Sequence, residues 1–71
     1  MEESINKKFG KRIVELRNEL NISQEELSLR CDLSRAYISY MERGKKSPTL
    51  KTIERLANGL NTDISTIFRN L

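Results

Sequence analysis

Apolar residues recur at the spacing of an α-helix along most of the chain, and short polar segments separate the repeats. Phe9, Ile13, Leu16 and Leu20 follow one another at intervals of four, three and four residues, which places them on one helical face. The pattern predicts an amphipathic helix over residues 5–20.

Four further helices are predicted from capping residues and apolar spacing. Ser23 and Glu26 form the S-x-x-E pattern of a capping box, which begins a helix at about residues 24–31. The other predicted helices cover about 35–43, about 50–58, and a last short stretch that starts at residue 64. The expected N-cap residues are Ser4, Ser23, Ser34, Thr49 and Asp63. The expected helix-ending residues are Asn21, Gly44 and Gly59. No segment alternates like a strand, so the fold class is all-α, a compact five-helix domain over residues 1–71.

The composition excludes several classes of function. The chain has 71 residues, no His and one Cys. A zinc site built from His and Cys, a Ser–His–Asp triad and a disulfide within the chain are therefore excluded. We expect no enzyme activity, no cofactor and no metal. No apolar run has transmembrane length, and a single Cys suits a reducing compartment, so we expect a cytoplasmic protein.

Positive charge is concentrated in one part of the chain. The net charge is +3, from 13 basic and 10 acidic residues. Residues 35–51 alone have a net charge of +4, from five basic residues and one acidic one: Arg35, Arg43, Lys45, Lys46 and Lys51 against Glu42. Such a stretch is often a solvated surface, but a local positive field also attracts polyanions.

The same basic stretch contains the second helix of a predicted helix-turn-helix unit. The helices at 24–31 and 35–43 are about eight residues each, and a turn of about three residues joins them. A turn this short holds the second helix across the first and leaves it exposed, the arrangement that places a recognition helix in a DNA major groove.

Several linked motifs carry a family resemblance. They are Ser23-Gln24-Glu25-Glu26-Leu27, Leu33-Ser34-Arg35-Ala36-Tyr37-Ile38-Ser39, Glu42-Arg43-Gly44 and Pro48-Thr49-Leu50. Over about residues 5–70 the chain resembles the Cro/repressor-type (XRE-like) helix-turn-helix family, whose fold is the lambda-repressor-like DNA-binding domain. Within that family it is most similar to controller proteins of bacterial restriction–modification systems. It departs from the usual pattern at Asp32, where Gly is common, and at Ser28, where Ala is common.

The position of each residue in this pattern suggests a role on DNA. Arg35, in the first turn of the second helix, can donate two hydrogen bonds to guanine O6 and N7. The candidate base-contacting residues are Arg35, Ala36, Ser39 and Tyr40. The candidate phosphate-contacting residues are Gln24, Ser34, Tyr37, Arg43, Lys45, Lys46, Ser47, Thr49 and Lys51. Ordinary alternatives remain, namely a core position for Tyr37, a simple helix former at Ala36 and a solvated loop for the lysines.

Two further features have structural interpretations. The resemblance implies that Glu42, an acid inside the basic stretch, forms a structural ion pair with Arg17. Cys31 is expected to be a small buried apolar side chain.

One helix-turn-helix reads only a few base pairs, so we expect a homodimer that reads two half-sites of a palindromic operator. The candidate dimer-interface residues are Ile64, Ile67, Phe68 and Leu71. The alternative is that all four close the core of a monomer.

Together these features predict a sequence-specific DNA-binding transcriptional regulator with double-stranded DNA as its partner. The resemblance to controller proteins implies two dimers on adjacent operators, activation at one site with repression at another, and RNA polymerase as a further partner. The alternative is a helix-turn-helix protein-interaction module, such as an antitoxin, whose main partner is another protein.

Overall fold

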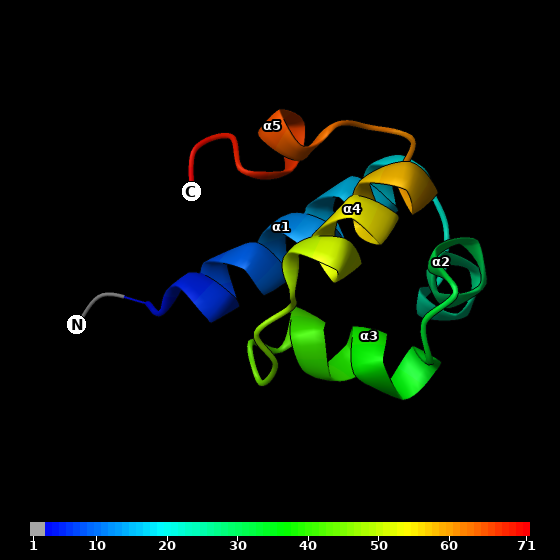
Figure 1. Cartoon of the computed structure of the whole chain (residues 1–71), viewed down its shortest axis with the longest axis horizontal. Helices are drawn as coiled ribbons and strands as arrows, with labels where there is room; N and C mark the ends of the chain where they lie inside the picture. Colours follow the sequence, from blue (N-terminus) through cyan, green and yellow to red (C-terminus); the bar gives the residue numbers. More distant parts are fainter. Residues whose placement is uncertain (1–2) are drawn as a thin grey trace.

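The computed structural model describes residues 3–71 and folds this part of the chain into five helices with no strand (Figure 1). They are α1 (Ile5–Glu19), α2 (Gln24–Cys31), α3 (Arg35–Glu42), α4 (Leu50–Gly59) and α5 (Ile64–Ile67). The bounds of α2 agree with the prediction, whereas α1 and α3 end one residue earlier and α4 one residue later than expected. Within residues 3–71 no helix has the length and apolar character needed to cross a membrane.

Each helix begins at the N-cap residue expected from the sequence. In every case the side-chain oxygen of the cap accepts a hydrogen bond from the backbone N–H three residues later, which satisfies one of the free amides at the helix start. The capping residues are Ser4, Ser23, Ser34, Thr49 and Asp63. At α5, hydrogen bonding from Thr66 and Ser65 lowers the pKa of the Asp63 carboxyl group.

Left-handed backbone ends the helices where polar residues or glycine permit it. Asn21, Asp32 and Gly44 have φ values of 58°, 56° and 78°. Asp32 therefore performs the turn for which the family more often uses glycine, and the Leu33 N–H donates to the Ser28 carbonyl at 3.0 Å across that turn.

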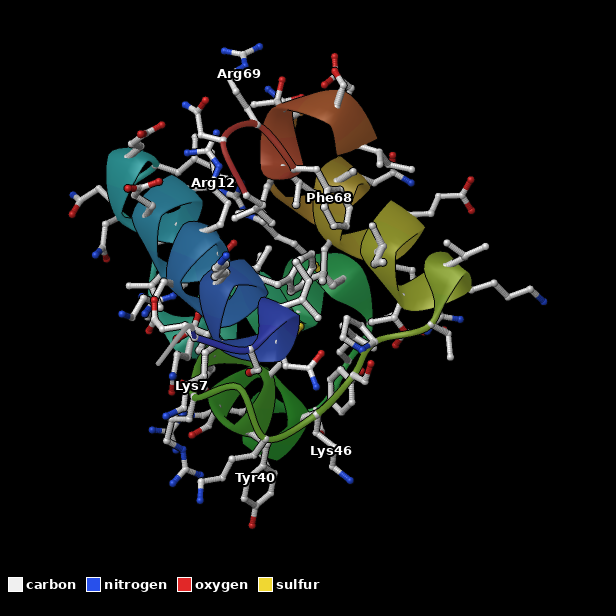
Figure 2. All side chains as sticks on the ribbon, turned by 90° about the vertical axis from the view of Figure 1, so that its left-hand side faces the viewer. Lys7, Arg12, Tyr40, Lys46, Phe68 and Arg69 are labelled. Carbon is white, nitrogen blue, oxygen red and sulfur yellow. The ribbon has the colours of Figure 1, made fainter. Side chains whose placement is uncertain are left out.

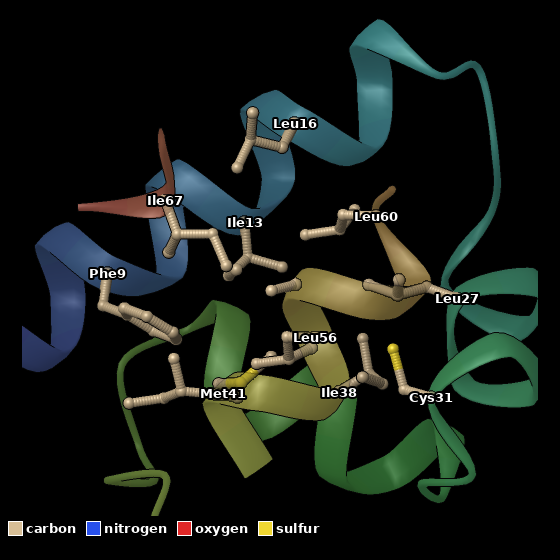
Figure 3. Packing of buried hydrophobic residues seen from close by; sticks show 12 residues of the cluster. Phe9, Ile13, Leu16, Leu27, Cys31, Ile38, Met41, Leu56, Leu60 and Ile67 are labelled. Carbon is tan, nitrogen blue, oxygen red and sulfur yellow. The ribbon is translucent and has the colours of Figure 1, made fainter. Parts of the chain in front are cut away.

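One apolar core lies between the helices (Figure 3). α1 and α2 pack against α3, α4 packs against α2, and α5 covers α1 and α4. The largest fully buried side chains are Ile13, Leu27, Ile38, Met41, Leu56 and Ile67. Every helix contributes to this set, so the position of α3 is determined by the whole core.

The C-terminal segment corrects one expectation. α5 ends at Ile67, so its four apolar residues do not share one helical face, and Ile67 is 0% exposed in the core. Ile67 is therefore not a dimer-interface residue. The terminal carbonyls of α5 accept hydrogen bonds from Arg12, whose Nη2 lies 2.7 Å from the Thr66 oxygen and whose Nε lies 3.3 Å from the Ile67 oxygen. Leu71 lines a hollow with Arg12 and Arg69, is 37% exposed, and donates its N–H to the Phe68 carbonyl at 3.2 Å, so its predicted interface role stays a prediction.

Gly59 has a different role from the one expected. It lies inside α4, is buried, and has no positive φ; Asn61, at φ 55°, makes the left-handed turn instead. A Cβ at position 59 would collide with Cys31 Sγ and lie 3.3 Å from Arg30 Cβ. The glycine thus allows α4 to approach the end of α2. Cys31 is buried as expected, and this burial raises the pKa of its thiol.

We expect Gly59→Ala to destabilise the fold by about 1–3 kcal/mol through overpacking, although alanine is the better helix former by about 1 kcal/mol. The cost should fall in a Cys31→Ala background, because the colliding sulfur is removed. Urea unfolding of the wild type, both single variants and the double variant measures this. Equal costs in the two backgrounds would show that Cys31 is not the obstacle.

Candidate nucleic-acid interface

α3 lies at one edge of the molecule, on the side away from α5 (Figure 1). Ile38 and Met41 anchor its inner side and are 0% exposed. Its outer side is free of other helices, so this part of the chain presents one face of α3 to solvent.

The four residues predicted to contact bases lie together on that outer face. With Arg43 they line one shallow hollow: Arg35, Ala36, Ser39, Tyr40 and Arg43. The Arg43 guanidinium lies 5.0 Å from the centre of the Tyr40 ring, and its Nε donates to the Ser39 carbonyl at 3.4 Å. Arg43 was expected at the DNA backbone, but it is held beside the side chains expected to read bases.

The loop after α3 carries the exposed cations. Lys45, Lys46 and Ser47 are exposed and follow the left-handed turn at Gly44. Tyr40 and Lys46 project at the same end of the molecule, opposite Arg69 (Figure 2). The loop therefore carries its positive charge toward the side on which α3 is exposed.

Three of the residues predicted to contact phosphates also make contacts within the protein. The Ser34 hydroxyl accepts from the Tyr37 N–H at 3.0 Å, and the Thr49 hydroxyl accepts from the Thr52 N–H at 3.2 Å. Tyr37 is half-buried and packs against the core, so the alternative of a core position is realised for part of its side chain. Lys51, by contrast, is exposed near the start of α4.

A buried carboxylate joins α3 to the first two helices. Glu42 Oε2 accepts from Arg17 Nε at 2.8 Å, and Glu42 Oε1 accepts from Arg17 Nη2 at 3.2 Å and from Gln24 Nε2 at 2.9 Å. Arg17 Nη1 also donates to the Ile22 carbonyl at 2.9 Å. The Glu42 side chain is 5% exposed.

The Arg17–Glu42 pair is the one implied by the family resemblance, but the sequence did not reveal the third partner. Gln24 was assigned to a phosphate. Its side-chain amide donates one N–H group to Glu42, so the predicted phosphate contact would have to come from the other N–H group. The segment Ser23-Gln24-Glu25-Glu26 could have indicated this contact, because Gln24 is the first residue of α2 and α2 packs against α3.

Removing Glu42 should be costly, because Arg17 would keep its charge in a site where its side chain is 14% exposed. We expect Glu42→Ala to lower the free energy of unfolding by about 3–5 kcal/mol. Glu15→Ala is the matched control, since Glu15 pairs with Arg12 but is 63% exposed, and it should cost under about 1 kcal/mol. Chemical denaturation compares the two, and similar losses would show that the Glu42 pair has no special structural weight.

Ile64 and Phe68 form the exposed apolar face of the α5 segment, one helical turn apart. They are 47% and 37% exposed. The Phe68 ring packs on Phe9 with 5.4 Å between ring centres, and Phe68 helps line a mainly apolar hollow with Ile5 and Pro48. This surface is separate from the exposed face of α3.

No group of three potential metal ligands is found in the described chain, residues 3–71. The fold and the exposed helix define a class of protein: a five-helix domain that presents the second helix of a helix-turn-helix unit. The family model described as helix-turn-helix matches residues 13–67. The chain belongs to this family, in its Cro/repressor-type (XRE-like) branch.

Among individual relatives, the chain is similar to control proteins. It is 42% identical over 53 residues to control protein C.BamHI of Bacillus amyloliquefaciens, covering 73% of this chain but only 65% of that relative. It is 34% identical over 65 residues to control protein C.MunI of Mycoplasma sp, covering 90% of this chain and 88% of the relative. Among solved structures, the restriction–modification controller protein C.AhdI from Aeromonas hydrophila superposes with a TM-score of 0.85 at 37% identity, over 87% of this chain and 94% of that one.

Proposed function

We propose that this protein is a sequence-specific DNA-binding transcriptional regulator that acts as a homodimer on palindromic operators, in the role of a restriction–modification controller. The observation that carries the proposal is the outer face of α3. There Arg35, Ser39 and Tyr40 share one hollow on a helix that is exposed on this side. The names of the similar control proteins support the regulatory role.

The chemistry of this face suits base recognition in a major groove. Arg35 is exposed in the first turn of α3, and a guanidinium there can donate to guanine O6 and N7. Ala36 is beside it and can meet a thymine methyl group, and Ser39 and Tyr40 offer hydroxyl groups one turn further on. The surface is a binding surface, and its mode of action is recognition without catalysis.

The neighbouring residues suit contacts to the DNA backbone. Lys45 and Lys46 are exposed in the loop that follows α3, and Lys51 is exposed near the start of α4; phosphate contacts from such cations add affinity without adding sequence information. Ser47 and the amides at the start of α4 complete this set, and Arg43, which lines the hollow itself, lies where α3 meets the loop.

A controller must discriminate its operators within a genome, and this requires more than one short half-site. We infer that two copies associate through Ile64 and Phe68, which leaves α3 of each copy free. Two such dimers on adjacent operators would then activate or repress according to the occupied site, with RNA polymerase as the responding partner in the cytoplasm.

Selection from a random duplex-DNA pool at near-physiological salt tests base recognition. The wild type should enrich a pseudo-palindrome with guanine in each half-site, the half-sites lying about one helical turn apart. Arg35→Ala should lose the preference at one base pair per half-site, equivalent to about 1–3 kcal/mol, since the bidentate contact is gone.

Arg69→Ala is the control for charge, because Arg69 lies at the end of the molecule opposite Tyr40 (Figure 2). It should retain the full motif. If the wild type enriches no motif and its binding disappears as salt rises, the protein is not a specific regulator.

Analytical ultracentrifugation tests the dimer surface. Ile64→Ser should weaken self-association, because it removes an apolar side chain from the proposed contact while leaving the core of the monomer intact. Leu29→Ser is the matched control: Leu29 is 74% exposed on α2, and its loss should leave the dimer constant unchanged. Equal effects of both variants would place the interface elsewhere.

A further inference from the structure

Lys7, in the first turn of α1, lies outside the helix-turn-helix motif but beside the loop that follows α3. If Gly44 carried a Cβ, that atom would be 2.5 Å from Lys7 Cγ and 2.9 Å from Lys7 Cα. The Lys7 stem therefore runs along the backbone between Arg43 and Lys45, thirty-seven residues later in the sequence.

The backbone of α1 on either side of Lys7 packs closely against the end of α3 and the loop after it. A Cβ at Gly10 would lie 2.5 Å from the carbonyl oxygens of Met41 and Glu42, so α1 meets the end of α3 backbone against backbone. With the close approach at Gly44, two contacts hold the first turns of α1 against the last turn of α3 and its loop. These contacts place the backbone of Lys7 beside the end of α3.

Figure 2 shows how the cations are distributed around the exposed end. Tyr40 projects outward, with Lys46 on one side and Lys7 on the other. Lys7 is exposed, and among residues 3–71 no carboxylate forms an ion pair with it. Lys11, one turn later, differs, because its ammonium group lies 2.6 Å from Glu3.

A DNA major groove is about 12 Å wide and has a phosphate strand along each side. A helix that enters the groove has one strand on either flank. We propose that Lys7 binds a DNA phosphate next to those bound by the loop that contains Lys46, because its side chain packs against Gly44 at the start of that loop. α1 then adds a phosphate contact that lies outside the helix-turn-helix motif itself.

The inference rests on the proposed function, since it requires duplex DNA on the face of α3. The placement of Lys7 does not depend on base recognition, because it follows from the close approaches at Gly10 and Gly44. A phosphate contact contributes to affinity for every sequence and gives a measurable salt dependence.

The test compares the salt dependence of binding for the wild type, Lys7→Gln, Lys7→Arg and Lys11→Gln. Each protein is titrated against the selected operator duplex and against a random duplex of equal length over a series of salt concentrations. Lys11→Gln is the matched control, because it removes the same charge from the same helix at a residue that lines the hollow beside Arg69.

For a dimer, Lys7→Gln should reduce the slope of log K against log salt by about two, one phosphate contact per protomer. Affinity should fall by the same factor for operator and random duplex, so the preference between them stays unchanged. Lys7→Arg should restore the slope. Thermal unfolding should be the same in all four proteins, which separates lost contact from lost fold.

Two results would overturn the proposal. If Lys7→Gln and Lys11→Gln change the slope equally, Lys7 acts only through the overall charge. If Lys7→Gln changes the preference between sequences while the slope is preserved, Lys7 does not bind a phosphate. Failure of the proposed function is a distinct outcome, because the wild type itself would then show no preference for any duplex.

Discussion

The buried carboxylate of Glu42 is the interaction on which the arrangement of the first three helices depends. It receives hydrogen bonds from Arg17 on α1 and Gln24 on α2 while standing at the last position of α3. The Glu42 side chain is only 5% exposed, and its charge is compensated by hydrogen bonds. The Arg17 guanidinium donates to both carboxylate oxygens, and the Gln24 amide donates to one of them. The network therefore joins the end of α3 to both α1 and α2.

Close approaches at three glycines also hold the helices together. Gly10 lets α1 touch the final carbonyls of α3, Gly44 lets the following loop touch Lys7, and Gly59 lets α4 touch Cys31. Each contact would be lost with any side chain at the glycine position. α3 is thus held by the core side chains Ile38 and Met41 and, at its end, by close backbone contact with α1.

The polar groups on the exposed end divide between structure and recognition. Ser34 and Thr49 use their hydroxyls to cap helices, and Gln24 uses an amide N–H to support Glu42. Arg35, Lys45 and Lys46 are exposed, and their charges are available to a polyanion. The groups that fix the position of α3 are therefore close neighbours of the groups proposed to bind DNA.

The amino-acid sequence by itself determined the local structure of this protein. Helical periodicity and the capping residues Ser23, Ser34 and Thr49 located the helices within a residue or two, because these signals act between residues that are close along the chain. The family motif located the exposed helix and its cations for the same reason. Only the tertiary structure decided that Gln24 donates to Glu42, that Ile67 belongs to the core and that Lys7 lies beside Gly44. These outcomes depend on contacts between residues far apart in sequence, and a periodic pattern carries no information about which distant surface a side chain will meet.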